Sequence, residues 1–327
     1  MTTTPNIVLQ YCIKQVVKII NSYYTNTGKE SQCNDIENIS IDKNMVNKNM
    51  KLGCTACHTA VVEKMIACGA DCWNGGLAGA CEGGHMVMVE KMIACGAYWW
   101  NDGLRGACIG GHMEMVDKMI AKGAFWWNDG LRAACRGGHM AMVEKMIACG
   151  ADWYDLGLQG ACIGGHMEMV DKMIACGAND WNMGLKGACC GGHMSVVEKM
   201  IACGATNFNT GMVEACKGGH VAVVEKMISK GADEWYWGLQ EACRKGIMVV
   251  VEKMIACGAT SFNRGLATAC YGGHMAVVEK MIACGADDWN WGLQGACEGC
   301  HVVMVEKMIA CGATKICCEE HRPLFNQ

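Results

Sequence analysis

Apolar and polar positions follow a pattern that repeats every 27 residues along most of this chain. Histidine recurs at this interval from His58 to His301, which is nine periods without an insertion. Position 247 falls on the same register but holds Ile. The chain therefore contains ten copies of one unit. Positions within a copy are numbered below from the His, which is position 0.

The apolar positions of each copy predict two short helices. Leu at −8, Ala at −5 and Cys at −4 form one helical stripe, and an Asn that usually stands at −11 is the expected N-cap. Gly-Gly at −2 and −1 should end this first helix. The second helix should start near the His, with apolar residues at +1, +4, +7 and +8, while an acidic residue at +5 and Lys at +6 face solvent. Gly at +11 should end it.

Such a helix pair is too short to bury its apolar stripe alone, so the copies must stack into a solenoid. Nine copies also carry an aromatic residue at −12, which we interpret as packing between adjacent copies. These residues are Trp73, Trp100, Trp127, Tyr154, Trp181, Phe208, Trp235, Phe262 and Trp289.

The ends of the chain depart from the repeat, as the caps of a solenoid should. Residues 1–45 are predicted to form an N-terminal cap, with an amphipathic helix over 5–24 followed by a polar, Asn-rich loop. Residues 46–313 form the predicted repeat solenoid. Residues 314–327 are predicted to be a closing tail.

The repeated motif resembles the ankyrin repeat. The stretch GHMEMVDKMIAKGA, residues 111–124, carries the ankyrin-like Gly-His, the hydrophobic residues at +4, +7 and +8, and the final Gly-Ala. The preceding Leu and Ala-Cys are similar to the ankyrin Leu and Ala-Ala. The resemblance covers roughly residues 46–313 and extends to ankyrin-like arrays of large DNA viruses and protists. It implies an all-α, ankyrin-like helix-pair solenoid of about ten repeats.

The period differs from the ~33 residues usual for ankyrin repeats, and the Thr-Pro-Leu-His segment is absent. The shortening falls where an ankyrin repeat carries its β-hairpin finger. We therefore expect the fingers to be lost or reduced to tight loops such as AYWWND, residues 97–102.

Composition and charge exclude several classes of protein. The net charge of −4 and the pI of about 6.2 argue against a nucleic-acid binder, which usually has a strongly basic face. A Lys or Glu interrupts every apolar stretch, so no segment reaches the ~20 apolar residues of a membrane span. We see no secretory signal, and we expect a cytoplasmic location, in the host cell if the chain is viral. The 26 cysteines are then expected to be reduced and to behave as small hydrophobic residues.

The paired Cys at −4 and His at 0, such as Cys108 and His112, suggest a metal site when one copy is considered alone. Zinc, however, requires about four ligands at close spacings, and each copy offers one Cys and one His. Since Ile247 replaces a His without disturbing the register, we favour a structural role and expect no metal or cofactor. A second series of cysteines stands at +10, where Lys122 and Lys230 replace Cys in two copies. Because this position accepts Lys, it should lie near the surface. The alternative is that the Cys and His residues store a metal ion or take part in redox chemistry.

No catalytic constellation stands apart from the repeat, so we expect a protein without enzymatic activity. Recognition should instead use the positions that vary between copies, namely −14, −13, −10, −7 and −3. The predicted partner-binding residues are Tyr98, Trp99, Asp102, Arg105, Phe125, Trp126, Arg132, Trp153, Gln159 and Lys186. Their aromatic and Arg content is typical of interface hot spots, although extra packing of the loops is an equal alternative for the rings.

The sequence thus predicts a non-catalytic scaffold for protein–protein interaction, which binds an unknown protein through its loop edge and first-helix face. The alternative is a structural repeat protein that self-associates within a larger assembly, such as a viral one. Neither nucleic acid nor membrane is an expected partner.

Overall fold

The computed structural model describes residues 43–299 and 301–314, and all regular secondary structure in these ranges is α-helical. The first helices of successive copies are α2 (Lys43–Thr55), α4 (Trp73–Gly83), α6 (Trp100–Gly110), α8 (Trp127–Gly137), α10 (Tyr154–Gly164), α12 (Trp181–Gly191), α14 (Phe208–Gly218), α16 (Trp235–Lys245), α18 (Phe262–Gly272) and α20 (Trp289–Glu298). The second helices are α3 (Thr59–Ala67), α5 (Met86–Ala94), α7 (Met113–Ala121), α9 (Met140–Ala148), α11 (Met167–Ala175), α13 (Met194–Ala202), α15 (Val221–Ser229), α17 (Met248–Ala256), α19 (Met275–Ala283) and α21 (Val302–Ala310). The predicted all-α solenoid of ten helix pairs is confirmed.

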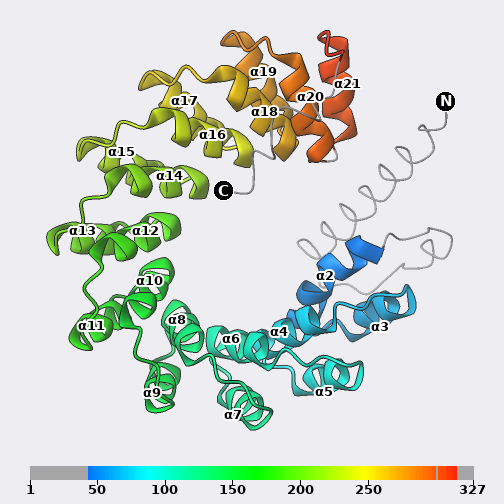
Figure 1. Ribbon diagram of the computed structural model, residues 1–327, viewed down its shortest axis with the longest axis vertical. Helices are drawn as coiled ribbons and strands as arrows, with labels where there is room; N and C mark the ends of the chain where they lie inside the picture. Colours follow the sequence, from blue (N-terminus) through cyan, green and yellow to red (C-terminus); the bar gives the residue numbers. More distant parts are fainter. Residues whose placement is uncertain (1–42, 300, 315–327) are drawn as a thin grey trace. The chain divides into compact units, whose positions relative to one another are not determined.

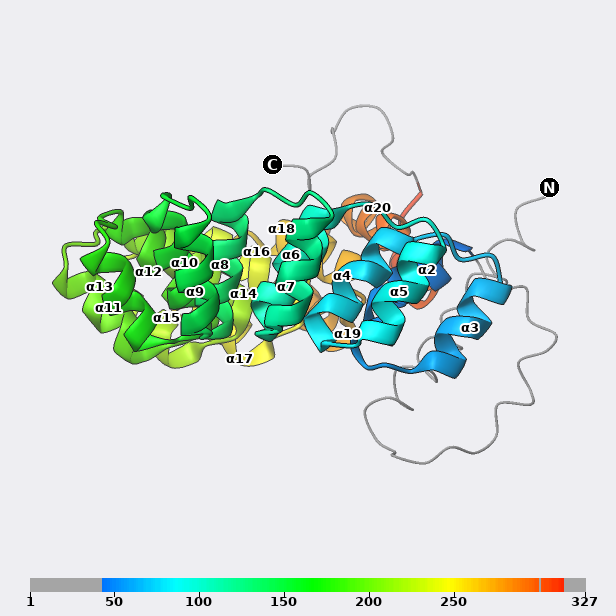
Figure 2. The same ribbon diagram turned by 90° about the horizontal axis from the view of Figure 1, so that it is seen from below.

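The helices belong to two compact units, whose sequence boundary falls within α12 and α13. In the unit that contains α4 to α11, the first helices lie side by side in one row and the second helices form another (Figure 1). The unit that contains α14 to α21 has the same two rows. The view in Figure 2 shows first helices such as α6 beside their own second helices, here α7. Successive copies contact each other mainly through their first helices.

Each copy is joined to the next by a short loop. Helix α5 ends at Ala94 and α6 begins at Trp100, and later copies keep the same spacing. No β-strand occupies these loops in the described residues. The expected loss of the β-hairpin finger is thereby confirmed.

Helix ends agree with the predicted glycines. The first helix α6 is followed by Gly111 with φ of 77°, and the second helix α7 by Gly123 with φ of 102°. Both values lie in the left-handed region that glycine adopts without steric cost. The corresponding glycines end the helices of copies two to nine in the same way, whereas Cys57 holds the left-handed position in the first copy, with φ of 55°.

Helix starts differ from the prediction. The first helix begins at the −12 aromatic residue, so the Asn at −11 is the second residue of the helix and is not its N-cap. The cap position is −13, where Asp180, Asn207 and Asp288 accept a hydrogen bond from a backbone N–H three residues later. Helix α2 begins at Lys43, three residues before the predicted start of the solenoid. The helix predicted over 5–24 and the tail beyond residue 314 lie outside the described residues.

The core is made of the predicted apolar positions. Leu at −8, Ala at −5, Cys at −4, and the residues at +4 and +7 are almost completely buried through the middle of the array. In four copies the Sγ of the −4 Cys faces the Sδ of the +7 Met in the next copy, as in Cys216 and Met254 at 3.8 Å. Both sulfur atoms act there as polarizable packing between copies.

Two glycine positions inside the first helix were not anticipated. At −9, a Cβ on Gly103 would lie 2.5 Å from the Met119 Sδ, so the Met of the same copy occupies the space of the missing side chain. At −6, a Cβ on Gly106 would collide with the carbonyl oxygen of Ala78 on α4. The glycine at −6 therefore permits a close approach of neighbouring first helices.

Candidate protein-interaction surface

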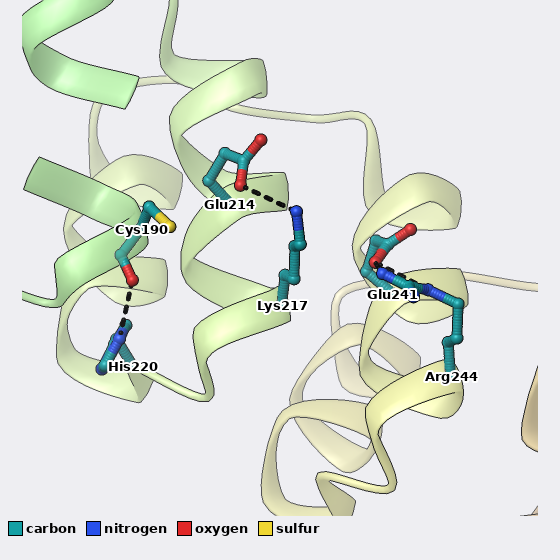
Figure 3. Close-up of polar contacts among 6 residues, drawn as sticks. All are labelled: Cys190, Glu214, Lys217, His220, Glu241 and Arg244. Carbon is teal, nitrogen blue, oxygen red and sulfur yellow. Dashed lines mark hydrogen bonds and ion pairs between the residues drawn. The ribbon is translucent and has the colours of Figure 1, made fainter. Parts of the chain in front are cut away.

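In four copies the His at position 0 is seen to form a hydrogen bond with the copy before it. The Nε2–H of His139 donates a hydrogen bond to the carbonyl oxygen of Ile109 at 3.0 Å, and His220 does the same to Cys190 at 3.1 Å (Figure 3). The acceptor lies in each case near the C-terminal end of the preceding first helix, where backbone carbonyls lack partners within the helix. The predicted structural role of this His is confirmed where these bonds are seen.

Both glycines of the Gly-Gly pair pack on these rings. A Cβ on Gly137 would lie 2.6 Å from the Cδ2 of its own His139, and a Cβ on Gly111 would lie 2.6 Å from the Cε1 of the same ring. The ring thus fills the space between the glycines of two copies. The Gly-Gly-His motif is therefore one packing unit.

The buried cysteines are protected thiols. Burial, with a smaller contribution from Cys149, raises the pKa of Cys108 to about 12. A buried thiol of this pKa is a poor nucleophile and a poor ligand. Among the described residues, no group of three His, Cys, Asp or Glu side chains is arranged to hold a metal ion. The cysteines at +10, such as Cys95 and Cys149, are partly exposed, as predicted.

The −12 aromatic residues are only half-buried. The Cδ1 of Trp127 lies 3.9 Å from the Cβ position of Gly150, which ends the second helix of the same copy. In the third copy, the Lys122 ammonium lies 5.8 Å from the centre of the Trp100 ring, within range of a cation–π contact. The interpretation of these rings as core is therefore corrected to partial burial. In three copies, those of Trp127, Trp181 and Trp289, the ring lies near the glycine that ends its own second helix.

The Asn at −11 holds the loop that follows its own copy. The Oδ1 of Asn101 accepts hydrogen bonds from the backbone N–H groups of Phe125 at 2.8 Å and Trp126 at 3.0 Å. Asn74 accepts in the same way from Tyr98 and Trp99. The loop before each of these first helices is thus held by an Asn side chain from the first helix of the copy before it. This is the role of the residue that the sequence predicted to be an N-cap.

Five aromatic side chains project from these anchored loops. Tyr98 and Trp99 precede α6, Phe125 and Trp126 precede α8, and Trp153 precedes α10. Their side chains are 49–65% exposed, whereas the rings at −12 are not. We call these five residues the aromatic ridge. Their exposure leaves their rings available to a partner.

The polar residues predicted beside the ridge lie on the first helices α6, α8, α10 and α12. Asp102 and Arg105 form an ion pair at 2.7 Å and so neutralise each other. Arg132 and Gln159 are half-buried, and Lys186 is exposed. The predicted set therefore consists of an aromatic loop edge and a separate polar helix face, rather than one charged patch.

The charged face of the second helices contains ion pairs between copies. The Lys at +6 contacts the acidic residue at +5 of the preceding copy, as in Lys145 and Asp117 at 2.8 Å and Lys253 and Glu225 at 2.7 Å. The acidic members are more than half exposed, so each pair contributes little to stability. The prediction of a solvated face is confirmed, and the pairing across copies is a new feature.

A second type of ion pair lies on the first helices of the seventh and eighth copies. Glu214 contacts Lys217 at 3.6 Å, and Glu241 contacts Arg244 at 2.5 Å (Figure 3). These glutamates stand at −6, where five of the other copies have the glycine of close approach. The acidic side chains at this position were not among the predicted site residues, because only the neighbouring −7 and −3 positions were considered variable.

Neither a protein-family model nor a curated protein matches this sequence. Among solved structures, the chain is similar to the human ASB11 ankyrin repeat domain, with 24% identity over 48% of this chain and 83% of that one, and a TM-score of 0.34. None of the described helices combines the length and the apolar character needed to cross a bilayer. By its own 27-residue motif and its helix packing, the described part of this chain is an all-α array of stacked helix pairs.

Proposed function

We propose that this chain is a non-catalytic scaffold that binds a protein partner through the aromatic ridge and the adjoining face of the first helices. The observation that supports it is the exposure of Tyr98, Trp99, Phe125, Trp126 and Trp153 in three consecutive loops. Exposed aromatic residues grouped in this way mark interaction surfaces more often than they serve the fold. Trp and Tyr also contribute a large share of binding energy at protein interfaces.

The anchored loops favour this function energetically. Binding by a mobile loop costs conformational entropy, and that cost falls when the loop is already held in one conformation. Each ridge loop is held by two backbone hydrogen bonds to the side chain at −11 of the preceding copy. The rings are therefore presented on a prepared surface. We place the interaction in a reducing, cytoplasmic compartment, where the buried cysteine column stays as packed thiols.

The test replaces Trp99, Trp126 and Trp153 by Ala together in the full chain. We expect the melting temperature measured by circular dichroism to stay within about 2 °C of the parent, since exposed side chains contribute little to stability. Capture of proteins from the cytosol in which the chain is expressed, quantified by mass spectrometry, should fall for the ridge-dependent partners. A matched control replaces Val87 and Val249, which are exposed on second helices, and should keep capture.

Two outcomes would overturn this proposal. A large loss of melting temperature would assign the three rings to the packing of the loops. Unchanged capture by a folded triple variant would remove the ridge from partner binding. Light scattering of the parent at several concentrations separates a true partner from a second copy of the chain.

A further inference from the structure

The eighth copy, which contains α16 and α17, departs from the repeat at three structural positions. Tyr236 replaces the Asn or Asp at −11, Lys245 replaces the small residue at −2, and Ile247 replaces the His at 0. Each of these positions carries a contact between copies elsewhere in the chain. Functional sites are expected where one copy of a repeat lacks the residues that pack the other copies together.

An aromatic pair and an arginine occupy the surface of this copy. Tyr236 and Trp237 are 40% and 36% exposed, and their ring centres lie 4.8 Å apart. The guanidinium carbon of Arg264, on the next first helix α18, lies 5.1 Å from the centre of the Trp237 ring. This distance is within the range of a cation–π contact, which orients the guanidinium plane.

Two polar atoms on the same helices, α16 and α18, lack hydrogen-bond partners. Gln240 is only 7% exposed, and its Oε1 accepts no hydrogen bond. The Nε of Arg264 is buried and donates none, and no carboxylate of the described residues forms an ion pair with Arg264. The neighbouring Arg244, in contrast, is paired with Glu241 at 2.5 Å. Buried polar groups are satisfied in nearly all folded proteins. The described residues hold five exceptions, including the equivalent Gln294 in the tenth copy, and Gln240 and Arg264 are the two on the neighbouring helices α16 and α18.

We propose that Tyr236, Trp237, Gln240 and Arg264, the copy-eight site, bind an acidic, extended segment of a protein partner. The segment's carboxylate pairs with the guanidinium of Arg264, and its apolar neighbours pack on the two exposed rings. A main-chain N–H of the segment donates to the Gln240 amide oxygen. That oxygen is covered in the free chain, and rotation about the terminal side-chain bond, which has a broad and shallow torsional profile, brings it to the partner.

The charge balance favours a single carboxylate over a polyanion. Arg264 is one unpaired cation in a chain with a net charge of −4, so a nucleic acid would be repelled by the rest of the molecule. The nearby Glu241 does not repel the segment strongly, because Arg244 neutralises it. This inference rests on the proposed protein-binding function but uses a surface separate in sequence from the aromatic ridge.

The test selects binders to the full chain from a displayed library of random twelve-residue peptides. We expect enrichment of peptides with Asp or Glu beside aromatic or aliphatic residues. Arg264→Gln should weaken their binding at least tenfold and Arg264→Lys by less, since Lys keeps the charge but loses the planar stack. Arg136→Gln, which alters an exposed arginine on α8, is the matched control and should change nothing.

A second pair of variants separates binding from folding. Gln240→Leu removes the unsatisfied oxygen, and Tyr236→Asn restores the acceptor found at −11 in most copies. Both should raise the melting temperature or leave it unchanged while weakening peptide binding. A purely structural role for these residues predicts the opposite relation, with stability and binding falling together.

The inference is overturned if the selected peptides show no acidic preference, or if Arg264→Gln binds them as the parent does. It is also overturned if single-stranded poly(dT) binds in an Arg264-dependent way and the peptides do not. The variant with Trp99, Trp126 and Trp153 replaced distinguishes the two proposals. If this variant loses all peptide binding and Arg264→Gln loses none, the result supports binding through the aromatic ridge and refutes binding through the copy-eight site.

Discussion

Replacing Gly106 by Ala should destabilise this protein, although the same change stabilises most helices. Gly in a helix interior is about 1 kcal/mol less favourable than Ala, because the free backbone loses more entropy on folding. At Gly106 the added Cβ would meet the carbonyl oxygen of Ala78, with the Ala78 carbonyl carbon and the Glu82 nitrogen both at 3.2 Å. All three atoms belong to the backbone of α4, so none can rotate away.

The clash can be relieved only if α4 and α6 move apart. Overpacking of this kind costs about 1–3 kcal/mol, which exceeds the gain in helix propensity. The fourth copy supports this account, because Ala133 stands at the same −6 position and α6 and α8 contact each other less extensively there than α4 and α6 do. We therefore expect Gly106→Ala to lower stability by about 1–2 kcal/mol after the propensity gain is subtracted.

Thermal melting followed by circular dichroism measures this effect, at roughly 2–4 °C for each kcal/mol in a domain of this size. Hydrogen exchange of the α4 and α6 amides shows whether the loss is local. Gly75→Ala on α4 is the control, since its Cβ meets only the rotatable Cys72 Sγ at 3.0 Å, and should stabilise by up to about 1 kcal/mol. If Gly106→Ala raises the melting temperature as Gly75→Ala does, the close-approach reasoning is wrong.

Three further predictions follow from the contacts between copies. Asn101→Ala removes the acceptor of two backbone N–H groups and should cost about 1 kcal/mol, with faster hydrogen exchange at Trp126; unchanged exchange would contradict the bridging role. His139→Ala leaves a carbonyl of the preceding copy without its donor and should cost about 1–3 kcal/mol, measured by urea denaturation, and a neutral result would show that water replaces the ring. In the native chain at pH 8, iodoacetamide should modify Cys176 well before Cys135, because burial raises the pKa of Cys135 to about 12; mass spectrometry showing equal rates would refute this.

The sequence alone was sufficient to predict the helix pairs, their glycine ends and the buried positions. These features depend on spacings within a single copy, which a helical period of 3.6 residues determines directly. The structural roles of His112 and Cys108 could also be inferred, because their repetition made a single site implausible. The predicted second helix and the predicted surface position of the +10 cysteines also agree with the structure, because both depend on spacings within one copy.

The features that could not be predicted involve two copies at once. Asn is a common N-cap residue, so its occurrence at −11 suggested that role for Asn101. In the structure, the Asn101 side chain instead contacts the loop before the next copy. Only the placement of one copy against the next distinguishes these two roles. The glycines at −9 and −6 had a visible signal, since glycine repeated inside a helix needs a packing reason. The identity of the atom that fills the space, such as the Met119 sulfur at Gly103, required the structure. The use of the aromatic ridge by a partner remains a prediction.

The contacts between copies run between fixed positions of adjacent copies, and this has a consequence for how such a gene can change. The Asn at −11, the His at 0 and the Lys at +6 each find their partner in an adjacent copy. Duplication or loss of a whole 27-residue segment by unequal recombination therefore reproduces every junction, and the array can lengthen or shorten without passing through a misfolded intermediate. Insertion of one residue within a copy disturbs the pairings of that copy with its neighbours, so we expect the number of copies to vary freely during evolution while their length stays fixed.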